Sequence, residues 1–175
     1  MTVGIIIGTN RKDAFTKNIA NYYAQQLITK GHQTQIIDLE QLPPDFAFTA
    51  LYQNSGKNPA FAAFQAQIDA SDRLIFIAPE YNGSFPGVLK TFIDGLRHPD
   101  SLTNKKACLV GLSAGVLGNA VGLGHLNDVL SYLNANVLGL RIKLGEVAKH
   151  FKDGAFTNPT FETFVEKQIN NFLSF

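Results

Sequence analysis

Short apolar runs alternate with amphipathic stretches along most of the chain. Five of these runs have the length and the continuous apolar character of parallel strands that are covered on both faces. We place the strands at residues 3–7, 34–39, 73–78, 106–112 and 136–144. Each run ends in polar or glycine-containing residues, which indicate a loop.

The stretches between the runs repeat apolar residues at the 3.6-residue period of a helix with one buried face. The clearest helix follows Pro86, which suits a first helical turn because its missing N–H needs no acceptor there. Its apolar face consists of Val88, Leu89, Phe92, Ile93 and Leu96. We expect further helices around residues 19–27, ended by Gly31, and at 59–71, 121–133 and 159–172.

The alternation of strand and helix predicts an α/β fold, a doubly wound parallel five-stranded sheet with helices on both faces. We expect the strand order 2-1-3-4-5 within a single domain that spans residues 1–175. In that order strands one, three and four are neighbours, so the loops that follow them meet at one edge. Ligands of open α/β sheets bind at this edge. The functional site is therefore expected where residues 8–16, 79–86 and 113–118 converge.

Composition narrows the function classes. Charged residues make up 17% of the chain and the net charge is +1, so no bulk charge favours nucleic acid or an anionic membrane. Cys108 is the only cysteine, which excludes an internal disulfide, and His32, His98, His125 and His150 lack metal-ligand spacing. The N-terminal run is too short for a signal peptide, and no apolar run reaches membrane-spanning length. We expect a cytoplasmic protein without a metal.

The first loop carries groups that suit a phosphate. Thr9 and Thr16 offer hydroxyls, Arg11 offers a guanidinium, and the following helix offers unpaired N–H groups with a partial positive charge. Charge-assisted hydrogen bonds contribute about 1.5–3 kcal/mol each, so a few of them supply much of a micromolar affinity. The loop is neither a Walker sequence nor a G-x-G-x-x-G fingerprint. The alternative is a helix whose arginine simply points to solvent.

A different enzyme class is suggested by residues 111–115, which match the G-x-S-x-G nucleophile elbow of α/β-hydrolases. Asp128 or Glu146 and then His150 follow Ser113 in the order that such a triad requires. Against this, Gly118 indicates a loop longer than an elbow, and no H-G-G-G oxyanion loop is present. A serine hydrolase that uses Ser113 stays as one alternative.

Three segments, one after each of strands one, three and four, form a combined pattern. They are Gly8-Thr9-x-Arg11 with Thr16, Pro79-Glu80-Tyr81-Asn82 with Pro86-Gly87-x-Leu89-Lys90-x-x-Ile93-Asp94, and Ser113-x-Gly115. Together they resemble the flavodoxin-like NAD(P)H-dependent FMN reductases, a family that includes quinone, azo-dye and chromate reductases. The resemblance covers essentially the whole chain. It implies FMN as cofactor, NADH or NADPH as hydride donor, and a flavin, quinone or similar small molecule as electron acceptor.

The resemblance also implies the cofactor-binding residues. The FMN phosphate would be held by Thr9, Arg11 and Thr16 with the backbone of Ala14 and Phe15. The isoalloxazine would be lined by Pro79, Glu80, Tyr81, Asn82 and Gly83, and at its other edge by Ser113, Ala114 and Gly115. No side chain is implied as a catalytic acid or base. The chain departs from the family at Asp13-Ala14, where many relatives have Gly-Ser, and in the third loop, which lacks a second glycine and an arginine.

Finally, the resemblance implies a homodimer or homotetramer. Phe46, Phe48 and Tyr52 are candidates to cover the flavin of a second subunit, and Tyr81 to stack near the open ring face or at a subunit contact. Asp13 brings a carboxylate near the phosphate unless it caps the following helix. A flavodoxin-like electron-transfer protein is the second alternative, but a net charge of +1 does not favour the charged docking face of such a shuttle.

Overall fold

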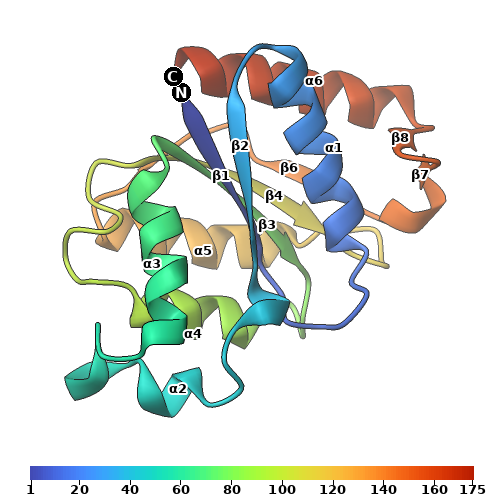
Figure 1. The fold of residues 1–175 in the computed structure, drawn as a ribbon. Coiled ribbons are helices and arrows are strands. Elements are labelled where there is room, and N and C mark those ends of the chain that lie inside the picture. The colour runs from blue at the N-terminus through green and yellow to red at the C-terminus, as the bar shows by residue number, and fades with distance from the viewer.

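The computed structural model describes residues 1–175 and contains an open parallel sheet between two layers of helices (Figure 1). The strands are β1 (Thr2–Ile7), β2 (Gln33–Asp38), β3 (Arg73–Pro79), β4 (Lys106–Leu112), β5 (Asn136–Val137), β6 (Ile142–Leu144), β7 (Phe151–Lys152) and β8 (Ala155–Phe156). The helices are α1 (Thr16–Thr29), α2 (Phe46–Thr49), α3 (Pro59–Ala70), α4 (Gly87–Gly95), α5 (Ala120–Tyr132) and α6 (Pro159–Ser174), with short 3₁₀ helices at Leu39–Gln41, Tyr52–Asn54 and Val147–Lys149. None of the helices combines the length and the apolar character that crossing a bilayer requires.

The strand order is β2-β1-β3-β4-β5 with parallel pairing throughout, which confirms the predicted order 2-1-3-4-5. The predicted fifth strand is divided, since β5 pairs with the start of β4 and β6 pairs with its end. Gly139 lies in the gap, and the Leu140 carbonyl accepts a hydrogen bond from the Gln168 side chain of α6 (2.8 Å). Gly139 is a weak strand former, and the Leu140 carbonyl bonds to α6 instead of to a neighbouring strand. Both interrupt the hydrogen bonding of this segment to β4.

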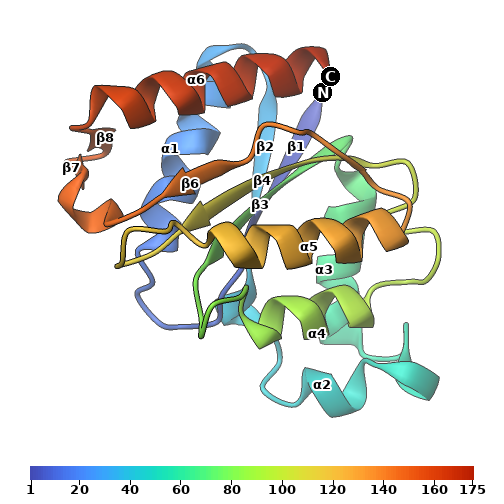
Figure 2. The same cartoon turned by 180° about the vertical axis from the view of Figure 1, so that it is seen from behind.

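The two faces of each central strand pack against different helices. Ile5 and Ile75 belong to a buried cluster with α1 and α6, whereas Ile6 and Phe76 belong to a second cluster with α3, α4 and α5. Figures 1 and 2 show these helical layers on opposite sides of the sheet. Because successive strand residues point to opposite faces, a sheet covered on both sides requires the continuous apolar runs seen in the sequence.

Two regions differ from the sequence-based expectation. No helix or strand is predicted between residues 40 and 58, but this stretch contains α2, whose Phe46 stacks on Phe61 with ring centroids 5.9 Å apart. Phe48 and Tyr52 point outward and are 84% and 83% exposed. The β7–β8 hairpin is absent from the prediction because each strand has only two residues. Its turn, residues 153–154, is an Asp-Gly pair with φ of 49° and 81°, a hairpin signal that the sequence does contain.

Both chain ends lie together at the edge of the sheet where the strands begin (Figure 1). The Met1 carbonyl accepts a hydrogen bond from the Gln33 N–H (3.1 Å). At the other end, Arg73 donates to the Phe172 carbonyl, and Lys106 donates to the last residue of the chain. Arg73 and Lys106 are the first residues of β3 and β4, so the loops that follow these strands lie at the opposite edge of the sheet.

Candidate active site

Hydrogen bonds connect the loops that follow β1, β3 and β4. The Gly8 N–H donates to the Ile77 carbonyl, and the Glu80 N–H donates to the Leu112 carbonyl, both at 2.8 Å. A Cβ on Gly8 would lie 2.9 Å from the Ile77 oxygen, so this close crossing requires glycine. The contacts follow from the strand order, because β3 lies between β1 and β4. The three loops therefore meet at the carboxyl edge of the sheet, as the sequence predicts.

The first loop presents hydrogen-bond donors that the protein itself does not use. The backbone N–H groups of residues 12–16 have no acceptor within the protein, and the Thr16 hydroxyl has no partner either. The loop turns at Asp13, which has a φ of 53°. Ala14 is buried beside it. Helix α1 begins at Thr16 without a side-chain cap, so Asp13 does not cap this helix.

Two cations of this loop remain free for an anion. Arg11 and Lys12 are exposed and form no ion pair. Lys17, by contrast, pairs with Asp38 (2.9 Å), the last residue of β2, and with Glu40 in the 3₁₀ helix that follows. Hydrogen bonds to Glu40 and then to Asp38 raise the pKa of Lys17 above its ordinary value. An anionic ligand at the start of α1 would therefore meet Arg11 and Lys12 rather than Lys17.

Tyr81 reaches from the second loop to the first. Its hydroxyl lies 2.7 Å from Oγ1 of Thr9. Oγ1 of Thr9 also accepts a hydrogen bond from the backbone N–H of Arg11 (3.2 Å). Thr9 is only 1% exposed, so its hydroxyl ties the two loops together from inside. This contact fixes the Tyr81 hydroxyl within the chain. That the Tyr81 ring stacks near an open flavin face or meets a second subunit stays a prediction.

The second loop ends in a tight turn from Tyr81 to Ser84. The Tyr81 N–H donates to the Ser84 carbonyl (2.8 Å), and the Ser84 N–H donates to the Tyr81 carbonyl (3.1 Å). Asn82 and Gly83 at the tip both have positive φ, 51° and 74°, and both are exposed. Their backbone N–H groups have no acceptor within the protein. The turn therefore offers backbone donors to the planar edge of a ligand.

The third loop folds back on itself through Ser113. The Ser113 hydroxyl donates to the Gly115 carbonyl (2.7 Å) and accepts from the Gly118 N–H (2.9 Å). Ala114 and Gly115 are exposed at the loop tip. No histidine bonds to Ser113, and the His150 ring instead packs edge-on against a phenylalanine. A nucleophile elbow is therefore not assembled here.

Asn119 is a site residue that the sequence reasoning missed. It is fully buried, it has a φ of 60°, and it directly precedes α5. Its amide nitrogen donates to the carbonyls of Ala78 (3.0 Å) and Pro79 (3.1 Å), and its backbone N–H donates to the Glu80 carboxylate (3.1 Å). Its Oδ1 is the one buried side-chain polar atom without a partner. Asn119 directly follows Gly118, and both have positive φ. Asparagine is one of the few residues other than glycine that adopt this conformation readily, which is the signal the sequence offered.

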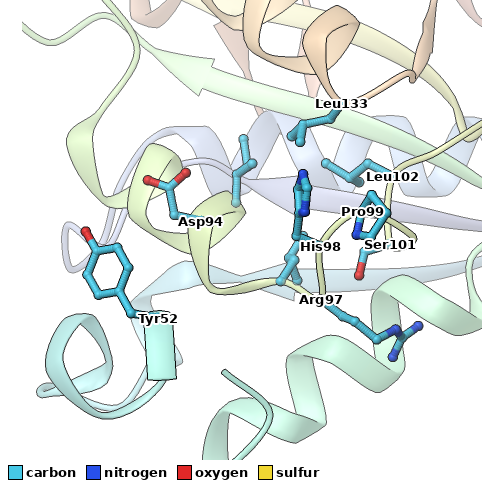
Figure 3. Close-up of a pocket in the computed structure, with 10 residues that line it drawn as sticks. Tyr52, Asp94, Arg97, His98, Pro99, Ser101, Leu102 and Leu133 are labelled. Carbon is cyan, nitrogen blue, oxygen red and sulfur yellow. The ribbon is translucent and has the colours of Figure 1, made fainter. Parts of the chain in front are cut away.

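A separate cavity of about 370 Å³ lies away from the three loops (Figure 3). Its walls include Tyr52, Asp94, His98 and Leu133, which come from the region beside the ends of α4 and α5. The Asp94 carboxylate is already paired with Lys90, four residues earlier on α4 (2.7 Å). None of the cofactor-binding residues inferred from the sequence lines this cavity.

Comparison with known proteins gives consistent results. The family model described as NADPH-dependent FMN reductase matches residues 1–147. The 2-hydroxy-1,4-benzoquinone reductase of a Burkholderia species is 31% identical over 137 residues, which cover 77% of this chain and 72% of that protein. The NAD(P)H:(acceptor) oxidoreductase FerB of Paracoccus denitrificans has a similar fold, with a TM-score of 0.81, 23% identity, and coverage of 99% of this chain and 95% of FerB. A flavodoxin variant of Pseudomonas aeruginosa shares the fold at a TM-score of 0.61 and 14% identity, with coverage of 99% and 97%.

Proposed function

This chain belongs to the NADPH-dependent FMN reductase family and is an NAD(P)H-dependent FMN and quinone reductase, and from that premise we propose that it binds FMN across its three loops. The proposal rests above all on the uncommitted donors of the first loop. Five consecutive backbone N–H groups, those of residues 12–16, and the Thr16 hydroxyl lack acceptors beside the free guanidinium of Arg11. A phosphate dianion requires this combination of donors and positive charge.

Thr9 and Tyr81 support the phosphate end of the proposed site. Their hydroxyls share one hydrogen bond, and Thr9 keeps its own hydrogen for a phosphate oxygen when Tyr81 is the donor. Ala14 and Phe15 contribute backbone at the start of α1. The charge of Asp13, which has no partner of its own, opposes phosphate binding.

The isoalloxazine ring belongs in this proposal between the second and third loops. The free N–H groups of Asn82 and Gly83 suit the carbonyl edge of the ring, with Pro79, Glu80 and Tyr81 behind them. Ser113, Ala114 and Gly115 lie at the other edge. No atom comes within 4 Å of the Cβ positions of Gly83 or Gly115, so the loops leave room for a planar group. Bound there, FMN supplies the redox chemistry that links NADH or NADPH to a flavin, quinone or similar small acceptor.

Substitution of Arg11 tests the phosphate site. Loss of one charge-assisted hydrogen bond costs about 1.5–3 kcal/mol, so Arg11→Ala should weaken FMN at least tenfold in a fluorescence titration of the apoprotein. Riboflavin lacks the phosphate, and its affinity should barely change. Lys12→Ala is the matched control, since Lys12 is the other free cation of this loop, and we expect a smaller loss. Equal losses for FMN and riboflavin would show that Arg11 is not at the phosphate.

We further propose that the chain acts as one FMN-binding domain and assembles as a homodimer or homotetramer through the surface beside α4 and α5. Tyr132 on α5 is 82% exposed, and Tyr52 stands near the end of α4 at the cavity of Figure 3. Exposed aromatic rings grouped on one surface favour burial against a second copy.

Light scattering tests this assembly. The unaltered protein should have at least twice the mass of one chain, and Tyr132→Arg should lower that mass at equal concentration. Phe164→Arg is the control, because Phe164 is a partly exposed aromatic residue on α6, in the opposite helical layer. A monomeric unaltered protein would reject the proposal.

A further inference from the structure

Ser84 and His125 form a hydrogen-bonded pair at the proposed flavin loop. Ser84 Oγ lies 2.9 Å from Nδ1 of His125. Ser84 closes the turn whose tip is Asn82 and Gly83, and His125 comes from the second turn of α5. The pair therefore connects the edge of the proposed ring site with a titratable side chain.

The close approach of α5 explains how His125 reaches the turn. A Cβ on Gly122 would lie 2.5 Å from the Ser84 carbonyl carbon and 2.6 Å from the Phe85 nitrogen, so the helix backbone rests directly on this segment. His125 follows Gly122 by three residues and thus projects from the same side of the helix. Neither the spacing of the histidines nor the family pattern identifies this pair.

The surroundings of the pair suit proton transfer. The His125 ring is exposed, and its Nε2 makes no hydrogen bond within the protein, so solvent can recharge it. Ser84 is half-buried beside Gly83. The Cβ positions of Gly83 and Gly87, on either side of Ser84, meet no atom within 4 Å, which leaves the turn accessible to a small acceptor.

We propose that Ser84 and His125 relay a proton to the oxygen of a quinone acceptor, an inference that rests on the FMN site proposed above. Conversion of a quinone to a hydroquinone requires two electrons and two protons. The established reaction supplies a hydride, which is both electrons and one proton. The Ser84 hydroxyl donates the second proton to the quinone oxygen while it takes a proton from Nδ1 of the charged imidazole. This leaves the imidazole neutral with its remaining proton on Nε2, and proton exchange between the exposed ring and solvent returns the proton to Nδ1.

Two acceptors separate this role from a structural one. Enzyme loaded with FMN and reduced anaerobically with NADPH is mixed with either 1,4-naphthoquinone or ferricyanide. The quinone needs the second proton, whereas ferricyanide takes single electrons and no proton. His125→Asn keeps an amide that can bond to Ser84 but cannot carry a proton at neutral pH. Because general acids contribute about 10²- to 10⁴-fold, we expect reoxidation by quinone to slow at least tenfold and reoxidation by ferricyanide to change less than about twofold.

Further variants keep the test decisive. Ser84→Ala should reproduce the selective loss, and Ser84→Thr, which restores the hydroxyl, should recover most of the rate with quinone. His32→Asn is the matched control, since His32 lies at the opposite edge of the sheet and should leave both rates unchanged. Unchanged quinone rates in His125→Asn and Ser84→Ala, or equal losses with both acceptors, would overturn the relay.

A measurement on the apoprotein is independent of turnover. In nitrogen-15 spectra of the histidines, Ser84→Ala should shift the Nδ1 signal of His125 and leave that of His32 in place. An unmoved His125 signal would show that the pair does not exist in solution and would overturn the relay. A protein that takes up no FMN would instead refute the proposed function itself, so the two failures are distinguishable.

Discussion

Two residues of the candidate site, Asp13 and Asn119, have a left-handed backbone conformation although neither is glycine. Asp13 and Asn119 have φ of 53° and 60°. Glycine adopts this conformation without cost, whereas other residues lose roughly 1–2 kcal/mol there, and Asn and Asp least of all. The side chains at these two positions therefore have effects that can be separated from the backbone cost by substitution.

At Asp13 the side chain is expected to oppose the cofactor. Asp13→Gly removes a carboxylate from the proposed phosphate site and fits the positive φ. We expect FMN to bind about threefold to tenfold more tightly, since two unit charges about 4 Å apart in water interact by about 1 kcal/mol. The advantage should shrink in high salt, which screens exposed charges. Titrations of both proteins at low and high ionic strength measure this, and a weaker complex for the glycine variant would contradict the phosphate position.

At Asn119 the side chain is expected to stabilise the site. Asn119→Ala loses the hydrogen bonds to two carbonyls of the β3 end and leaves alanine in a left-handed conformation. Asn119→Gly loses the same bonds without the backbone cost. We therefore expect both variants to be destabilised and the alanine variant to be worse by about 1 kcal/mol. Urea unfolding of the apoproteins provides the comparison, and equal stability of the two variants would contradict the strained backbone.

Among the elements, those with strong periodic signals could be predicted from the sequence, and those set by tertiary contacts could not. The bounds predicted for the fourth strand are those observed, and the third strand and the helix after Pro86 differ by about one residue at their ends. The fifth strand is different, because its interruption depends on a carbonyl that bonds to Gln168 in a distant helix. The short β7–β8 hairpin lacks the length at which alternation becomes readable, although its Asp-Gly turn is visible in the sequence.

Two glycines of α5 should respond in opposite ways to the same substitution. A Cβ on Gly122 would lie 2.1 Å from Oδ1 of Asn119 as well as against the Ser84 and Phe85 backbone, whereas a Cβ on Gly124 would meet nothing within 4 Å. Gly122→Ala should therefore lose about 1–3 kcal/mol from overpacking. Gly124→Ala should gain about 0.5–1 kcal/mol from its better helix propensity. Thermal or urea unfolding of both variants tests this, and a stable Gly122→Ala protein would mean that α5 is not held against the turn.

At the scale of the whole molecule, the position of the candidate site follows from the strand order alone. Alternating elements predict the order, and the order brings together loops that lie far apart in the sequence. The contacts inside the site could not be predicted in the same way. Thr9 and Tyr81 are 72 residues apart, and Ser84 and His125 are 41 apart. Such pairs depend on side-chain directions and on close approaches such as that at Gly122, which no local pattern contains.

The two chain ends lie side by side at the edge of the sheet opposite the candidate site (Figure 1). We therefore expect the fold to form even when its segments are joined in a different order. A circular permutant in which a flexible linker joins Phe175 to Met1, with new ends between Asp153 and Gly154 in the exposed hairpin turn, should fold and keep its affinity for FMN within about threefold. A permutant opened between Asn82 and Gly83 should lose the ring contacts and bind FMN poorly. Together, the two permutants would show that the chain can be opened at the hairpin turn but not within the proposed FMN site.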